Sequence, residues 1–415
     1  MTRMRRKKIK PVISLILVTA VLLCSGIASA EKTILVTFTG DITLGGKDDE
    51  RNSADCFDNV AKEKGYDYFF ANFREMFTSD DLTVGNLEGP LTDSKAGKSS
   101  KLHAFRGKTD FAKILPLSGV DAVTLSNNHM GDYGKQGEQS TKQALEDNGV
   151  HWFQDYTYYL YEKDGIRIAF FGLQNSVLYT QRARFLKKIA EAREVDKANA
   201  VVILWHTGTE YKRFHDVDTE KKVTALINDG AADLIIISHA HVAQGMSIIN
   251  NRSVFYSLGN FVFGGNRNIR TGKTPKDPLC ISLYGMVVQA KLTFTDAGRY
   301  LGQQMTVYPV FTSSAKPDYR PEGELTRKLL FSNDYRPMRL TLKQAEAVYE
   351  CIKQDTAIDI PEMTEKNGLA EIDFPYLPAF DGVLVPEDED SAGPVGMPEA
   401  ASAKPTREGK DNKGN

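Results

Sequence analysis

The sequence predicts an α/β fold in which a β-sheet is covered by helices on both faces. Three observations support this prediction. Short runs rich in apolar and β-branched residues alternate with segments of helical periodicity between residues 33 and 237. Runs such as VDAVTL and AVVIL are typical of strands buried inside such a sheet. Further on, Asn250-Asn251 and the segment 296–298 interrupt β-rich runs, which predicts additional antiparallel strands.

The individual elements follow from local patterns. Residues 33–39 (TILVTFT) are β-branched and lead into Gly40, which predicts a strand and a tight loop. The helix expected at 135–148 has Ala144 and Leu145 on one face and Gly149 as a stop signal. Asp164-Gly165 predicts a hairpin turn. The remaining strands are expected at 82–84, 120–125, 158–161, 166–172, 200–204 and 232–237, and the remaining helices at 109–117, 217–228 and 342–353.

The two ends of the chain differ from this body. Residues 1–30 combine a basic start, an apolar run and Ala28-Ser29-Ala30, which predicts a signal peptide, with a retained membrane anchor as the alternative. Residues 386–415 contain almost no apolar side chains and are expected to be disordered. The main domain is therefore expected at 31–311, followed by a C-terminal extension with a helix at 312–385.

Composition excludes some classes of function. Without residues 1–30, 46 basic residues face 54 acidic ones, a net charge of −8. A basic face that could follow phosphates is missing, so nucleic acid is not an expected partner. Three cysteines then remain and no Cys-x-x-Cys pair occurs, which argues against a disulfide framework and a thiolate zinc site.

Polar residues of metal-ligand type follow five of the expected strands. They are Asp41, Glu88, Asn128 with His129, His206, and His239 with His241. The carboxyl ends of strands form the crevice where open α/β sheets bind ligands. Carboxylate, amide and imidazole groups suit divalent zinc, manganese or iron.

Each of these residues also has an ordinary explanation when taken alone. An aspartate after a strand is usually a turn former or a helix cap, and a His-x-His pair is more often structural than a ligand pair. Five separate strand ends with a potential ligand would then require five independent coincidences. A shared metal or acid–base site is therefore the favoured hypothesis.

Six motif blocks follow one another between residues 34 and 265. They are Gly40-Asp41 with Leu44, Asn86-Leu87-Glu88, Asn127-Asn128-His129 with Asp132 and Gly134, His206-x-Gly208-x-Glu210-Tyr211, His239-x-His241, and Tyr256-Ser257-Leu258-Gly259-Asn260-Phe261-x-Phe263. In these blocks and their order the chain resembles the CapA family, the bacterial capsule or poly-γ-glutamate synthesis proteins. This family resembles the calcineurin-like metallophosphoesterases. The resemblance implies their four-layer αββα sandwich, two packed sheets flanked by helices.

The same resemblance implies roles for individual residues. Asp41 corresponds to a first metal ligand and Glu88 to a carboxylate that bridges two metals. Asn128, His206, His239 and His241 correspond to the other ligands. His129 corresponds to the histidine that protonates the leaving group, with Asp132 as the residue that orients it. The implied cofactor is one or two divalent ions of Mn, Zn or Fe, which clamp a phosphoryl group.

The sequence departs from the metallophosphoesterase pattern at several positions. Thr43 stands where a histidine is usual two residues after the first aspartate, and Ser238 replaces the usual glycine before His239. Glu210 is either a further ligand or a carboxylate that orients His206. Asn260 could reach the site from its turn. Lys101 and Arg106 are expected on the solvated surface, with contact to an anionic substrate as the alternative, and no role is expected for His103, His151 and His215.

Two classes of function follow. The first is an exported metal-dependent hydrolase of phosphoester type in capsule or poly-γ-glutamate biosynthesis, acting on an anionic envelope polymer or a phosphoester. The second is a non-catalytic subunit of a poly-γ-glutamate synthesis and export complex. Either would work outside the cell or in the cell envelope, with membrane contact only through residues 1–30.

Overall fold

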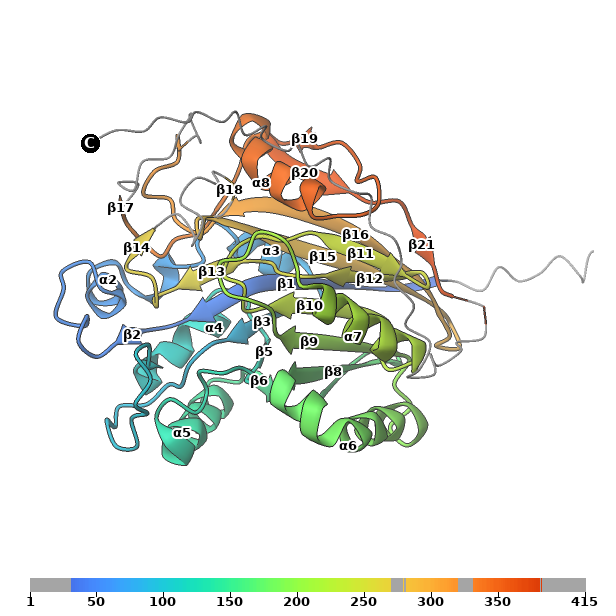
Figure 1. Ribbon diagram of the computed structural model, residues 1–415, viewed down its shortest axis with the longest axis horizontal. Helices are drawn as coiled ribbons and strands as arrows, with labels where there is room; N and C mark the ends of the chain where they lie inside the picture. Colours follow the sequence, from blue (N-terminus) through green and yellow to red (C-terminus); the bar gives the residue numbers. More distant parts are fainter. Residues whose placement is uncertain (1–30, 270–278, 280, 320–330, 381, 383–415) are drawn as a thin grey trace, which may run out of the picture.

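The computed structural model describes residues 31–269, 279, 281–319, 331–380 and 382 (Figure 1). The expected signal peptide at 1–30 and the expected disordered tail at 386–415 lie outside the described residues. Among the described residues, no helix combines the length and the apolar character needed to cross a membrane.

Two large sheets form the centre of the molecule. The first sheet has the strand order β19-β20-β16-β15-β1-β3-β5-β6, with β13 paired to β1 and with β18 and β21 paired to β16. Its strands are β1 (Glu31–Thr43), β3 (Leu82–Leu87), β5 (Ala122–Thr124), β6 (His151–Phe153), β13 (Asn260–Phe263), β15 (Tyr284–Thr295), β16 (Tyr300–Phe311), β18 (Met338–Arg339), β19 (Thr364–Lys366), β20 (Leu369–Asp373) and β21 (Leu377–Pro378).

The second sheet has the strand order β11-β12-β10-β9-β8-β7. Its strands are β7 (Tyr159–Lys163), β8 (Ile166–Gln174), β9 (Ala200–His206), β10 (Leu234–Ser238), β11 (Met246–Ile249) and β12 (Arg252–Phe255). Two small pairs complete the strands, β2 (Gly46–Lys47) with β4 (Phe105–Arg106) and β14 (Asn268–Ile269) with β17 (Phe331–Ser332).

The helices belong to three groups. Those near the first sheet are α2 (Phe57–Lys64), α3 (Arg74–Ser79), α4 (Ile114–Leu117) and α5 (Gly134–Asp147), with the short 3-10 turns η1 (Tyr66–Tyr68) and η2 (Thr109–Lys113). Those near the second sheet are α6 (Asn175–Glu194), which Figure 1 shows below β8, and α7 (Val217–Asn228), which it shows beside β9 and β10. The last helix, α8 (Leu342–Gln354), packs against β15, β16 and β20.

Three apolar clusters define four layers. One lies between the two sheets and includes Phe38 of β1 and Phe170 of β8. A second joins the first sheet to α2–α5, and a third joins the second sheet to α6 and α7. Phe170 and its neighbour Phe171 point into different clusters, so β8 is buried on both faces and needs a continuous apolar run. The expected αββα sandwich is confirmed.

Most of the expected elements are confirmed within a few residues. The helix expected at 217–228 has those bounds, and Asp164 and Gly165 have φ angles of 52° and 75°, as a hairpin turn between β7 and β8 requires. Several findings differ from the expectation, among them the unexpected helix α6. β1 continues to Thr43, so Asp41 lies within the strand at an irregularity in its pairing with β3. The extension after residue 311 adds β18, β20 and β21 to the edge of the first sheet.

Candidate metal centre

The polar side chains singled out by the sequence gather where the two sheets meet. Strands β1, β3 and β5 run parallel in the first sheet, and β8, β9 and β10 run parallel in the second. Their carboxyl ends bring Asp41, Glu88 and His129 from the first sheet to His206 and His241 from the second. The site is therefore built half from each sheet.

Glu88 occupies the centre of the group. It is fully buried directly after β3, and the Nε2 atoms of three histidines lie 3.7–3.8 Å from its Oε1. Neither carboxylate oxygen has a hydrogen-bond partner among the described residues. Burial raises the pKa of Glu88 well above its usual value, because no donor compensates for the lost hydration. A buried carboxylate with two free oxygens is suited to accept a cation.

Asp41 is the second buried carboxylate. Its Oδ1 accepts a hydrogen bond from Asn86 at 2.8 Å, and its Oδ2 lies 3.4 Å from His241 Nδ1. Burial opposes ionisation, but the contacts with His241 and the charge of His206 outweigh it and lower the pKa of Asp41 to about 2. Asp41 is thus held as a carboxylate.

The loop after β10 presents His239 and His241 in an unusual conformation. Their φ angles are 110° and 58°, in the region that side chains other than glycine rarely adopt. Such conformations cost about 1–3 kcal/mol each and persist where surrounding contacts impose them. One such contact joins the His239 backbone N–H to Asp41 Oδ2 at 3.2 Å. We name residues 239–245 the histidine loop.

A close approach of two glycines brings Asn260 to the same place. Asp41 donates its backbone N–H to the Gly259 carbonyl at 2.9 Å, and a Cβ atom on Gly40 would lie only 2.2 Å from that oxygen. This contact places the start of β13 beside β1, and Asn260 Oδ1 lies 2.9 Å from His241 Nδ1. Asn260 therefore orients the His241 ring and leaves its Nε2 directed toward Glu88.

His206 ends β9 and faces the first sheet. Its Nε2 lies 2.9 Å from Asn128 Oδ1, and its Nδ1 lies 3.3 Å from Asn86 Nδ2. Asn86, for which the sequence suggested no role, also binds Asp41 and accepts a hydrogen bond from Asn127. Asn86 therefore connects Asp41 and Asn127 on the side of the first sheet to His206 on the side of the second.

The pKa values of His206, His239 and His241 are shifted in different directions. Burial, followed by the neighbouring His239, lowers the pKa of His206 well below its usual value. Burial and the charge of His241 lower the pKa of His239 to about 4. Burial acts in the same direction on His241, but Glu88 and Asp41 outweigh it and raise its pKa well above 6.5. Without a metal, the two carboxylates thus favour the protonated form of His241.

His129 and Asp132 form a hydrogen-bonded pair at one side of the site. His129 Nδ1 lies 2.7 Å from Asp132 Oδ2, so that Nε2 points toward Glu88. Asp132 is fully buried and also accepts hydrogen bonds from the Phe105 backbone N–H at 2.8 Å and Lys101 Nζ at 2.9 Å. The pair has the geometry of an imidazole oriented by a carboxylate.

Three groups of described side chains have the mutual distances of a metal site. They are Glu88 with His206 and His239, Asp41 with Glu88 and His241, and Glu210 with His239 and His241, with ligand atoms within 4.8 Å of one another. Glu88 belongs to two groups, as a bridging carboxylate would. The unpartnered Glu88 oxygens and the unpartnered His239 Nδ1 also fit a bound cation. The residues present thus fit one or two divalent ions.

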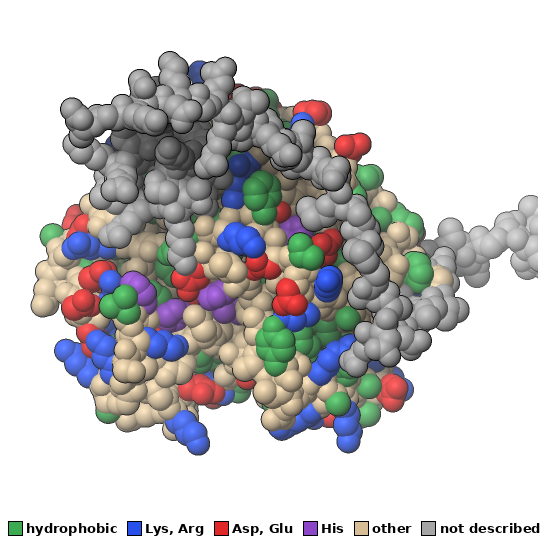
Figure 2. All heavy atoms as spheres, viewed as in Figure 1, with side chains coloured by type: hydrophobic (Ala, Val, Ile, Leu, Met, Phe, Trp, Pro, Cys, Tyr) green, Lys and Arg blue, Asp and Glu red, His purple; other side chains and the backbone are tan. Residues whose placement is uncertain are grey.

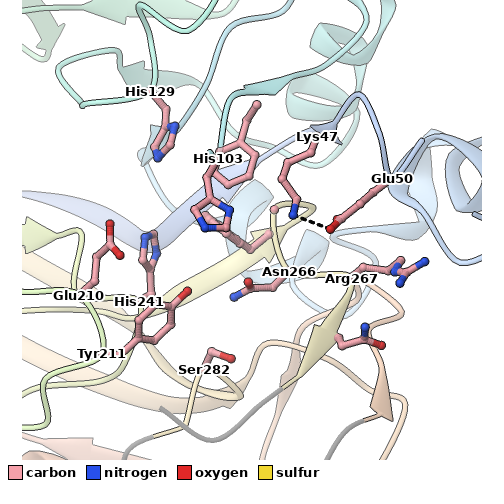
Figure 3. A pocket seen from close by; sticks show the side chains of 14 residues that line it. Lys47, Glu50, His103, His129, Glu210, Tyr211, His241, Asn266, Arg267 and Ser282 are labelled. Atoms are coloured by element: carbon pink, nitrogen blue, oxygen red, sulfur yellow. Dashed lines mark ion pairs between the residues drawn. The ribbon is translucent and has the colours of Figure 1, made fainter. Parts of the chain in front are cut away.

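A cavity of about 350 Å³ opens onto this cluster. Figure 3 shows His129, His241, Glu210 and Tyr211 on one side, with His103, Lys47, Arg267 and Asn266 around them. Figure 2 shows histidine side chains gathered on this face among acidic and basic ones. His103 was not expected to have a role, and only the fold brings it to the cavity. No spacing in the sequence signals its position.

Other residues differ from the sequence-based expectation. Arg106 was expected on the solvated surface but is buried, with Nε 2.8 Å from Asp48 Oδ1 and Nη1 bonded to the Thr92 carbonyl. Lys101 is exposed, as expected, and its Nζ lies 2.9 Å from Asp132 Oδ1. Thr43 donates its hydroxyl to the Glu88 carbonyl oxygen at 2.9 Å and supports the peptide that carries Glu88.

Sequence comparisons agree with this geometry. Residues 35–265 match the family model described as "Bacterial capsule synthesis protein PGA_cap". Over 255 residues the chain is 29% identical to the capsule biosynthesis protein CapA of Bacillus anthracis. The aligned region covers 55% of this chain and 60% of that protein. Over 257 residues it is 29% identical to the PGA biosynthesis protein CapA of Bacillus subtilis (strain 168), covering 56% and 64%. The chain thus spans less than two thirds of either relative.

Solved structures give weaker likenesses. A hypothetical protein from Thermus thermophilus aligns with a TM-score of 0.39 and 15% identity, covering 66% of this chain and 99% of that one. The calcineurin-like phosphoesterase YfkN from Bacillus subtilis aligns with a TM-score of 0.38 and 16% identity, covering 79% and 97%. These likenesses add nothing to the architecture described above.

Proposed function

The chain belongs to the family of the bacterial capsule synthesis protein PGA_cap, and we propose that it is an exported metal-dependent hydrolase of phosphoester type that acts in capsule or poly-γ-glutamate biosynthesis. The observation that carries the chemistry is Glu88. Its two buried oxygens have no hydrogen-bond partner among the residues that the structure describes, and its Oε1 lies within 3.8 Å of three imidazole nitrogens. A protein interior seldom keeps such a carboxylate without a cation to bind it.

The residues that would hold the ions are those predicted from the sequence, with one addition. Asp41, Glu88, Asn128, His206, His239 and His241 supply oxygen and nitrogen ligands. Glu210 supplies a further carboxylate beside His239 and His241, which offsets the absence of a histidine at Thr43. Divalent Mn, Zn or Fe bound there would provide Lewis-acid stabilisation of charge on a phosphoryl oxygen.

The other residues of the chain account for binding and proton transfer. The cavity admits a phosphoester group beside the cluster, and its wall carries Lys47, which pairs with Glu50, and Arg267, which pairs with Asp55. His129 Nε2 faces the same space and donates a proton to the departing oxygen, while Asp132 holds the other ring nitrogen. These are the parts of a general-acid step.

Metal loading tests the cofactor. Purified protein is stripped with a chelator, reloaded separately with Mn, Zn or Fe, and analysed for bound metal. We expect wild type to retain at least one of these metals and His239→Ala/His241→Ala to lose it. His151→Ala is the matched control, because His151 is exposed and stacks on Tyr159 away from the cluster. If the metal content of wild type after loading does not exceed the background, the proposed metal-dependent function is wrong.

Turnover of aryl phosphate mono- and diesters tests the chemistry. His129→Ala should keep its metal and lose about a hundred- to ten-thousandfold in rate. The loss should shrink as the leaving group becomes a weaker base, because such a group hardly needs the proton. A variant that loses metal together with activity would assign His129 to metal binding instead of proton transfer.

A non-catalytic subunit of a poly-γ-glutamate synthesis complex is the second candidate. It is favoured by Thr43, which replaces a usual ligand and uses its hydroxyl to bind the main chain. Metal-loaded wild type without turnover on the ester panel would support it. For either candidate, N-terminal sequencing of the exported protein should give a start near Glu31, whereas an intact Met1 in the membrane fraction would identify an anchor.

A further inference from the structure

A buried aspartate outside the family-matched region contacts both loops of the candidate metal centre. Asp355 is the residue after α8, in the C-terminal extension, and is 7% exposed. It lies 90 residues beyond the end of the matched region at residue 265. Its carboxylate nevertheless faces the segments that carry His239, His241 and Glu210.

The first set of contacts fixes the end of the histidine loop. The Gly245 backbone N–H donates to Asp355 Oδ2 at 2.8 Å, and the Met246 N–H donates to Thr356 Oγ1 at 3.0 Å. Gly245 packs so closely that an added Cβ would lie 2.1 Å from the Asp355 carbonyl oxygen. The histidine loop is therefore joined to the end of α8 immediately before β11 begins.

The second set fixes the loop between β9 and α7, residues 207–216, which we name the Glu210 loop. The His215 backbone N–H donates to Asp355 Oδ1 at 3.1 Å, and His215 Nδ1 lies 2.9 Å from the same oxygen. The His215 ring stacks face to face on Tyr256, with centroids 3.7 Å apart and an interplanar angle of 3°. His215, for which the sequence suggested no role, thus connects Asp355 to the Glu210 loop.

The two loops also contact each other. The Tyr211 N–H donates to the Ala240 carbonyl at 2.8 Å, and Gln244 Nε2 donates to the Lys212 carbonyl at 2.7 Å. One carboxylate thus closes a network that holds both loops in one arrangement. Such a network is what the positive φ angles of His239 and His241 require.

We propose that Asp355 is a positioning residue, which fixes the histidine loop and the Glu210 loop so that Glu210, His239 and His241 present one preformed metal site. This inference rests on the proposed metal-dependent function. With this role for Asp355, the C-terminal extension contributes to the structure of the metal site, although the family match ends at residue 265.

Three variants test the proposal. Asp355→Ala removes both acceptor oxygens, whereas Asp355→Asn keeps one acceptor and the shape of the side chain. Asp233→Asn is the matched control. Asp233 is also 7% exposed and accepts a backbone N–H, from Val201 at 2.9 Å, but it precedes the opposite end of β10.

Metal titration is the first measurement. The dissociation constant of the ion held by Glu210, His239 and His241 should rise about ten- to a hundredfold in Asp355→Ala, as found when residues that orient ligands are removed. Asp355→Asn should lie between that variant and wild type, and Asp233→Asn should match wild type. Wild-type affinity in Asp355→Ala would overturn the proposal.

Amide hydrogen exchange of the metal-free proteins is the second measurement. Exchange should accelerate in both loops in the Asp355 variants and remain unchanged in β9 and β10. Unchanged loops, or an equal increase throughout the protein, would refute a positioning role. If wild type binds no metal, the proposed function fails, while the exchange data still decide whether Asp355 orders the loops.

Discussion

Glu88→Met should stabilise the metal-free protein while weakening its response to metal. The substitution replaces a fully buried carboxylate by an apolar side chain of similar length. Glu88 has two buried oxygens without a hydrogen-bond partner, and each unsatisfied buried polar group costs about 1–3 kcal/mol. The loss of the contact with His241, 3.7 Å away, works in the opposite direction. Because His241 keeps the carboxylate of Asp41 3.4 Å away as a partner, we expect a net gain of about 1–3 kcal/mol, the cost of one unsatisfied buried polar group.

Metal should reduce this advantage. A ligand at a hundred times its dissociation constant stabilises the folded state by about 2.7 kcal/mol per site. Wild type should gain this amount for each bound ion in urea unfolding measured with and without metal, whereas Glu88→Met should keep at most the gain from the group of Glu210, His239 and His241, which does not include Glu88. The gap between the two proteins should therefore narrow by about 2.7 kcal/mol for each ion that Glu88 helps to hold.

Glu371→Met provides the contrast. Glu371 is 5% exposed but lies 4.0 Å from Arg339 and 3.7 Å from Lys366, so its charge is compensated. That variant should be destabilised with and without metal. If metal-free Glu88→Met were also less stable than wild type, Glu88 would be a structural carboxylate and the argument from its unpartnered oxygens would be wrong.

Two further predictions concern protons. The pKa values of His241 and of Glu88 are both raised in the metal-free site, so metal binding should release protons. Calorimetric heats that are equal in buffers of different ionisation enthalpy would contradict this. The pKa of His215 is raised because its contacts with Asp355 outweigh the effect of burial. The stabilisation by protonated His215 is complete below pH 6.5 and is lost as the pH rises through the raised pKa. In urea unfolding, the free energy of unfolding of wild type should therefore exceed that of His215→Gln by more at pH 5.5 than at pH 9. A difference that grows with pH would refute the raised pKa of His215.

The alternating elements of the sandwich were predictable because their patterns are local. The helix 217–228 and the hairpin at Asp164-Gly165 each depend on residues close in sequence. The helix α6 was missed although it is 20 residues long. Its backbone leaves helical geometry at Gln181, with φ −146° and ψ 35°, so the buried residues before and after this kink do not share one periodicity.

The candidate ligands were predictable for a different reason. Asp41, Glu88, His206 and His241 stand at or near strand ends, and the carboxyl ends of parallel strands converge. The supporting residues carry no such signal. Asp355 reaches His215 across 140 residues of sequence, and nothing in the spacing of the chain indicates that contact.

Each of two candidate ligand groups draws its members from both sheets. Glu88 of the first sheet joins His206 and His239 of the second, and Asp41 with Glu88 joins His241. A bound ion would therefore cross-link the sheets at the edge of the apolar layer between them. Metal affinity and sheet packing are thus thermodynamically linked, since an ion that binds only the folded arrangement stabilises it.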